Sequence, residues 1–193
     1  MKLILARHGE TLNNIEKIMQ GQTHGELSPL GKEQAYNLGK RLSKMGIDYI
    51  YCSDLERAKH TADEILRHVK SPIEYTADLR ELNAGEYEGR TYSEYQKELL
   101  KSPDIMNYKP KGGESINEMN NRFSGFIKEL EKKHTNQTIL LVGHGGPIAN
   151  FMLKILPDKE FEEVISPNCA ISILTKENNG YKVELLNCTE HLC

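Results

Sequence analysis

The sequence predicts an α/β fold: a three-layer α/β/α sandwich with a mostly parallel central sheet and a C-terminal antiparallel addition. Short apolar runs alternate with longer amphipathic segments, the pattern of a parallel sheet covered by helices on both faces. Near the end of the chain, Asn178-Asn179-Gly180 separates two strand-like runs and is typical of a hairpin. A chain of 193 residues is long enough for one sizeable core, so we expect residues 1–193 to form a single domain.

Six strands are expected. The first is an apolar run at 3–6, and a β-branched, apolar run at 138–142 gives a later one. A strand ending near Cys52 leads into a helix, for which Ser53 or Asp54 is the expected N-cap. The predicted strands are 2–6, 48–52, 73–76, 137–142, 169–175 and 181–187.

Five helices are expected between these strands. Leu30, Leu38 and Leu42 recur at near-helical spacing, which predicts a helix over 29–45 with Gly46 as its stop. The predicted helices are 29–45, 55–68, 91–101, 115–133 and 146–155.

The stretch 83–113 differs from the rest of the chain. It is rich in tyrosine, lysine and glycine and ends in the turn Lys109-Pro110-Lys111-Gly112-Gly113. Long excursions in compact domains are often functional, so we expect a cap or substrate lip; a plain surface connection is the alternative. Its tyrosines would either stack on a substrate ring or pack internally.

Composition excludes several function classes. The net charge of −3 argues against a general nucleic-acid binder, whereas a small anionic substrate needs only a local positive field. The start of the chain does not read as a signal peptide and no run has the length of a membrane span, so we expect a cytoplasmic protein. Cys52, Cys169, Cys188 and Cys193 lack zinc-site spacing and are expected to be free thiols.

Two strands each deliver a histidine among glycines just past their ends. Arg7-His8-Gly9 follows the first strand, and Gly143-His144-Gly145-Gly146 follows the run at 138–142. Ligands of α/β sheets bind at the carboxyl ends of strands, so we expect the two imidazoles to meet in one crevice. For His8 alone, an ordinary loop position would be as good an interpretation.

A third segment adds a cation to this crevice. Arg57 is expected in the first turn of a helix, beside free backbone N–H groups that favour anions. Arg7, Arg57, His8 and His144 would then form a positive pocket with no obvious counter-charge. Such a pocket suits a phosphoryl group, because a guanidinium matches phosphate oxygens in a bidentate fork.

These motifs resemble the histidine phosphatase superfamily, also called phosphoglycerate mutase-like, over nearly the whole chain. Arg7-His8-Gly9-Glu10-Thr11 matches the family signature, and the later elements occur in family order. They include Asn14, Ser53, Arg57-Ala58, Glu81, Glu86-Tyr87-Glu88-Gly89, Gly113-Glu114-Ser115 and His144-Gly145-Gly146.

The resemblance implies a phosphohistidine mechanism. A neutral imidazole can attack phosphorus, so His8 is the expected nucleophile, and neighbouring cations should lower its pKa. One ring nitrogen of His8 must be fixed by a hydrogen bond that leaves the other free. Arg7, Arg57 and His144 would clamp the phosphoryl oxygens. No metal and no cofactor is expected, because the arginines supply the charge.

Further roles are carried over by alignment. Glu81 aligns with the family acid, although Glu86 and Glu88 lie close by and such a cluster is more often a solvated face. Asn14 aligns with a phosphate-binding position, and a cap or turn role is nearly as good an interpretation. Gln20, Gly21 and Gly145 are expected to line the substrate site.

The phosphatase branch is favoured over the mutases. The segment from Glu81 to His144 is short, Gly146 replaces the asparagine typical of mutases, and the C-terminus resembles alpha-ribazole and broad-specificity phosphatases. We expect a phosphomonoesterase acting on a small phosphorylated metabolite, with no nucleic-acid or membrane partner; an oligomer is possible. The alternatives are a cofactor-dependent phosphoglycerate mutase and a non-catalytic scaffold that binds a phospho-ligand.

Overall fold

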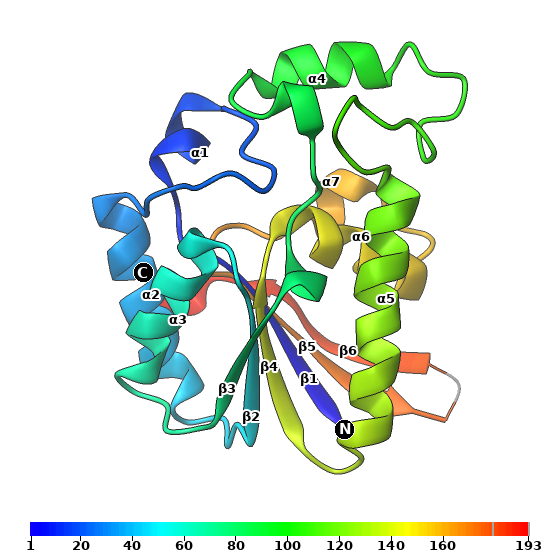
Figure 1. Ribbon diagram of the computed structural model, residues 1–193. Helices are drawn as coiled ribbons and strands as arrows, with labels where there is room; N and C mark the ends of the chain where they lie inside the picture. The colour runs from blue at the N-terminus through cyan, green and yellow to red at the C-terminus, as the bar shows by residue number, and fades with distance from the viewer. Residues whose placement is uncertain (179, 193) are drawn as a thin grey trace.

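The computed structural model describes residues 1–178 and 180–192, and it shows one six-stranded mixed sheet with helices on both faces (Figure 1). The strand order is β3-β2-β4-β1-β5-β6. The strands are β1 (Lys2–Arg7), β2 (Tyr49–Ser53), β3 (Ile73–Thr76), β4 (Thr138–Gly143), β5 (Ile171–Glu177) and β6 (Gly180–Cys188). The first four strands pair in parallel, whereas β5 runs antiparallel to both β1 and β6. The predicted fold class and C-terminal addition are therefore confirmed. Asn179 of the expected hairpin turn, and Cys193, lie outside the described residues.

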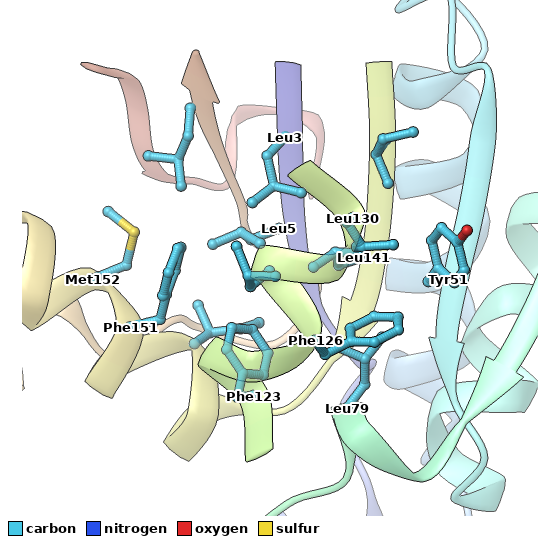
Figure 2. Close-up of a cluster of buried hydrophobic side chains, with 14 of the residues drawn as sticks. Leu3, Leu5, Tyr51, Leu79, Phe123, Phe126, Leu130, Leu141, Phe151 and Met152 are labelled. Carbon is cyan, nitrogen blue, oxygen red and sulfur yellow. The ribbon is translucent and has the colours of Figure 1, made fainter. Parts of the chain in front are cut away.

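Successive side chains of β1 point to opposite faces and anchor two separate cores. Leu3 and Leu5 pack against α5 (Ile116–Lys133) and α6 (Gly145–Ile155), with Phe123 and Phe151 facing them in Figure 2. Ile4 and Ala6 pack against α2 (Pro29–Leu42) and α3 (Glu56–Leu66) on the opposite face. Because both faces are covered, the central strands β1 and β4 are apolar and buried over most of their length, as the sequence indicates.

The structure corrects the expected start of α3. Its N-cap is Leu55, which makes no side-chain capping bond, and not Ser53 or Asp54. Both polar side chains are used elsewhere: Asp54 pairs with Arg80 at 2.6 Å, and the Ser53 hydroxyl lies 2.8 Å from a ring nitrogen of His144. Arg57 still falls in the first turn, as predicted.

The end of α2 and the shortest helices also differ from expectation. The α-helix ends at Leu42. Backbone hydrogen bonds from amides to the carbonyls three residues earlier extend the coil to Met45, and Gly46 then adopts a φ of 59°. Two helices were not expected, α1 (Leu12–Glu16) and α7 (Phe161–Val164). They are five and four residues long, too short to produce an apolar period, and each starts with a capping box.

The segment 83–113 lies at the end of the molecule toward which the parallel strands run. It contains α4 (Tyr92–Leu99), drawn at the top of Figure 1. Tyr87 and Tyr95 of this segment pack edge to face, and with Met19, Leu82 and Met119 they belong to a third, smaller core. The segment is thus a packed layer over the carboxyl ends of the strands; whether it moves stays a prediction. Among the described residues, no helix combines the length and apolar character needed to cross a membrane.

Candidate active site

The pairing of β1 with β4 brings the two histidines together. The two strands are adjacent and parallel with Arg7 opposite Gly143, so the residues that follow them leave the sheet side by side. The backbone N–H of His8 donates to the carbonyl of Gly143 at 3.0 Å, extending the ladder by one residue. The ring centroids of His8 and His144 are 5.2 Å apart. The two imidazoles therefore meet at the carboxyl ends of these strands, as the sequence predicts.

His8 is buried and held through one ring nitrogen. Its Nδ1 lies 2.7 Å from the backbone carbonyl of Gly9. A carbonyl oxygen can only accept, so Nδ1 carries the proton and Nε2 keeps its lone pair. Burial lowers the pKa of His8 well below its ordinary range, and the charges of Arg57 and Arg7 lower it further. The imidazole is therefore neutral at physiological pH. The cations act in the expected direction, although burial is the larger cause.

His144 is held through the opposite ring nitrogen. Its Nε2 lies 2.8 Å from the Ser53 hydroxyl, while its buried Nδ1 has no partner among the described residues. The Ser53 oxygen accepts a bond from the Leu55 amide at 3.3 Å, and its hydroxyl hydrogen is available to Nε2; when Nε2 accepts it, Nδ1 of the neutral ring carries the proton. In this arrangement Nδ1–H of His144 is a donor pointing away from Ser53. Burial and the Arg57 charge lower the pKa of His144, which favours the neutral ring.

Both arginines are fixed by backbone carbonyls. Arg57 is 1 % exposed and donates to the carbonyls of Thr23 at 3.0 Å and Gly21 at 2.7 Å. Arg7 donates to the carbonyl of Ser166 at 2.7 Å. In both side chains Nε is buried and has no partner among the described residues. With Nδ1 of His144, three buried nitrogens are thus left unpaired on the groups that neighbour His8. Buried donors are nearly always satisfied, so this set suits an oxyanion.

Glu81 supplies the counter-charge that the sequence did not reveal. Burial lowers the pKa of Arg7 and of Arg57, and Glu81 is the largest opposing influence on both. The carboxylate of Glu81 accepts from the amides of Leu82 at 2.9 Å and Gly146 at 3.1 Å. A Cβ on Gly146 would lie 2.4 Å from Glu81 Oε1, so only glycine lets the carboxylate approach the start of α6.

The neighbouring acids serve the loops instead. Glu88 accepts from the amides of Gln22 at 2.8 Å and Ala84 at 3.2 Å, and Glu86 accepts from the Lys111 amide at 3.3 Å. Of the three acids that the sequence leaves open, the structure places Glu81 beside the arginines.

Four other expected site residues are placed as supports. Asn14 exchanges capping bonds with Thr11 at 3.1 and 3.2 Å, and the buried side chain of Gln20 also donates to the Thr11 hydroxyl. Gly21 offers its carbonyl to Arg57 and has a φ of 53°, a conformation that favours glycine. Gly145 starts α6, where a Cβ would approach the Arg7 guanidinium to 3.4 Å. Gly145 lines the cavity beside Arg7, whereas the other three do not.

Arg122 is a residue that sequence reasoning missed. It lies on α5 and donates from Nη1 to the carbonyls of Ala77, Asp78 and Arg80 at 3.0, 2.9 and 3.0 Å. Its Nη2 lies 2.7 Å from a carboxylate oxygen of Glu114. Arg122 therefore holds the turn that carries Glu81. In the sequence it sits in a strongly polar helix, where an arginine is usually solvated.

Comparison with known proteins agrees with this geometry. Residues 3–189 match the model of the histidine phosphatase superfamily (branch 1). A broad-specificity phosphatase of Saccharomyces cerevisiae is 30 % identical, with 100 % of this chain and 87 % of the relative covered. An adenosylcobalamin/alpha-ribazole phosphatase of Escherichia coli is 32 % identical, and the match covers 81 % of this chain and 79 % of the relative.

Solved structures agree as well. The alpha-ribazole phosphatase of Shigella flexneri superposes with a TM-score of 0.86 at 28 % identity, covering 98 % of this chain and 97 % of that chain. The family match, the curated phosphatases and this fold all span the residues that form the crevice. The chain belongs to the histidine phosphatase superfamily.

Proposed function

We propose that the protein is a phosphomonoesterase that works through a phosphohistidine on His8. The observation that carries the proposal is the free Nε2 of neutral His8 in a site where His144 lies 5.2 Å away, ring to ring, and where Arg7, Arg57 and His144 each keep one buried nitrogen without a partner in the described part of the chain. Nε2 attacks the phosphorus of the substrate, a phosphorus–nitrogen bond forms, and the bond from phosphorus to the ester oxygen breaks. Water then attacks phospho-His8, releasing inorganic phosphate and restoring the imidazole.

The unpaired nitrogens stabilise the phosphoryl group during transfer. The two guanidinium groups and the Nδ1–H of His144 donate to its non-bridging oxygens. Because carbonyls already fix both arginines, these donors need little rearrangement when charge develops. The guanidinium charges do the work that a metal ion performs elsewhere, so the proposed reaction needs no metal.

Glu81 is proposed to move the protons. In the first step its carboxylic acid gives a proton to the departing alkoxide, and in the second its carboxylate takes one from the attacking water. The proton count balances over one turnover, since the acid form is restored. The position of Glu81 against the start of α6, where it borders the cavity together with Arg7, supports this role.

The test is hydrolysis of p-nitrophenyl phosphate in the presence of a chelator. We expect turnover that is unaffected by the chelator, acid-labile phosphate on the protein, and loss of both in His8→Ala. His60→Ala, which removes an exposed imidazole on α3, is the matched control and should keep full activity.

Three outcomes would overturn the assignment. Retained activity in His8→Ala would remove the nucleophile. Exchange of 2- and 3-phosphoglycerate without net release of phosphate would indicate a mutase. Binding of phosphate esters without turnover would indicate a scaffold.

A further inference from the structure

A cavity of about 330 Å³ opens from the catalytic groups beneath α4. Arg7, Glu81 and Gly146 form one end of it. The remaining wall comes mainly from α4, the start of α5 and the region of α7; Figure 1 shows α4 at the top and α7 and the start of α5 below it. Its apolar and aromatic side chains include Tyr95, Leu99, Ile116, Met119, Phe161 and Ile165. The volume lies in the range of small-molecule sites.

Beyond the catalytic end, the described part of the wall has two amide side chains, Asn150 and the exposed Gln96, and offers no charge to a charged group. Among the described lining residues Arg7 is the only cation, and it belongs to the phosphoryl end. Asn150 is already engaged, since its Nδ2 donates to the carbonyl of Gly146 at 2.9 Å and its Oδ1 lies 3.5 Å from Nδ2 of Asn120. A carboxylate in this cavity would lose its hydration without gaining a counter-charge.

Tyr92 marks the boundary between the two ends. It is the first residue of α4, its surface is 45 % exposed, and it lines the cavity together with Arg7 and Glu81. Burial raises the pKa of Tyr92, and the Glu81 charge raises it further. Phe161, 38 % exposed, borders the cavity from α7. Two aromatic rings on separate elements therefore flank the entrance.

We propose that this cavity binds the alcohol part of the substrate, and that this part is uncharged and largely apolar, such as an aromatic or branched aliphatic alcohol. The inference rests on the proposed phosphomonoesterase function. Apolar contact is worth about a fourfold gain in affinity for each methylene buried, so the preference should be large for a ring-sized group.

The first experiment compares primary alkyl esters, whose leaving groups are chemically alike. Release of inorganic phosphate is measured for 2-phenylethyl phosphate, ethyl phosphate and 3-phosphoglycerate. We expect kcat/KM for the phenylethyl ester to exceed that for 3-phosphoglycerate by at least about tenfold, because only the former gains apolar contacts.

The second experiment places a cation in the cavity wall. Leu99 ends α4 and lines the cavity, whereas the adjacent Leu100 is 65 % exposed and does not line it. Leu99→Lys should shift the ratio of the two kcat/KM values toward 3-phosphoglycerate by at least about tenfold, because the new ammonium pairs with the carboxylate. Leu100→Lys, the matched control, should leave the ratio as it is.

The outcomes separate this inference from the function on which it rests. Hydrolysis of ethyl phosphate and 3-phosphoglycerate with no advantage for the phenylethyl ester would overturn the apolar cavity alone. An unchanged ratio in Leu99→Lys, with ethyl phosphate still hydrolysed, would do the same. No hydrolysis of any ester, p-nitrophenyl phosphate included, would overturn the phosphatase assignment and the inference together.

Discussion

At the residue scale, the two histidines of the site are held in opposite ways. The Gly9 carbonyl fixes Nδ1 of His8, and the Ser53 hydroxyl lies against Nε2 of His144. His8 therefore presents a lone pair, and His144 presents a donor. One imidazole is prepared to form a bond to phosphorus while the other binds an oxygen of the same group.

The buried histidines should make stability depend on pH. Both have a folded-state pKa well below the unfolded value near 6.5, so the unfolded chain binds more protons. Their contribution is fully present above pH 6.5 and is lost as the pH falls below it. Each neutral histidine then costs about 1 kcal/mol for the step from pH 6.5 to 5.5. Urea unfolding at pH 8.0, 6.5 and 5.5 should show this loss.

A variant isolates the histidine contribution from that of the acids. His8→Asn removes one titrating ring, so its stability should fall less between pH 6.5 and 5.5 than that of the wild type. Asp54, whose pKa is lowered by its bond to Arg80, contributes only at lower pH. Equal pH slopes in the two proteins would show that His8 is protonated in the folded state.

The sequence predicted which residues gather but not how they are held. Arg7, His8, Arg57 and His144 could be placed together because each follows a strand or begins a helix at one edge of the sheet. The carbonyls that fix them come from Gly9, Gly21, Thr23 and Ser166. A carbonyl is common to every residue, so no side-chain pattern identifies the one that is used. Roles assigned to Asn14, Gln20 and Gly21 were uncertain for the same reason.

At the element scale, the start of α6 brings Glu81 to the arginines. The Gly146 amide donates to the carboxylate, and the missing side chain leaves room for it. A single helix thus provides His144 as its N-cap and a backbone donor for the acid two residues later. The free N–H groups of a first turn favour an anion at this position.

Gly146→Ala should therefore displace Glu81. A Cβ would lie 2.4 Å from Oε1, and we expect kcat for ethyl phosphate to fall about a hundredfold or more, as when one positioned catalytic group is lost. The loss for p-nitrophenyl phosphate should be smaller, because its leaving group departs without a proton. Steady-state kinetics on both esters check this, and equal losses would argue against a role of Glu81 as acid.

Gly125→Ala is the matched control for this substitution. Gly125 lies within α5, and a Cβ there would meet nothing within 4 Å. Alanine should leave both kcat values unchanged and stabilise the helix by about 0.5–1 kcal/mol. Thermal unfolding of the two variants then separates a local effect on Glu81 from a general effect of alanine in a helix.

Elements were predictable where burial imposes a long enough period. The strands were predicted from short apolar runs, and the longer helices from apolar residues that recur every three to four positions. The short helices α1 and α7 show none, and local capping boxes define them. The N-cap of α3 was mispredicted because Ser53 and Asp54 have distant partners, and such tertiary bonds outweigh a local preference.

At the scale of the whole molecule, one side chain of α5 ties the turn that carries Glu81 to the helix layer and to Glu114. Arg122 of α5 reaches three carbonyls of the turn before Glu81 and the carboxylate of Glu114. The Arg122–Glu114 pair is mostly buried, with 19 % and 17 % of the side chains exposed. The same turn carries a second arginine, Arg80, whose pair with Asp54 is more exposed, at 36 % and 26 %.

The two arginines should therefore differ in their effect on stability. Arg122→Met leaves Glu114 and several carbonyls without their buried donor, and we expect a loss of about 3 kcal/mol in the free energy of unfolding. Arg80→Met breaks a pair that water partly screens, so about 1 kcal/mol or less is expected. Arg122→Met should also lower kcat for ethyl phosphate, because the turn that positions Glu81 is no longer tied to α5. Urea unfolding and steady-state kinetics on both variants check the prediction. Equal losses of kcat for ethyl phosphate in Arg122→Met and Arg80→Met would mean that α5 does not hold the acid in place.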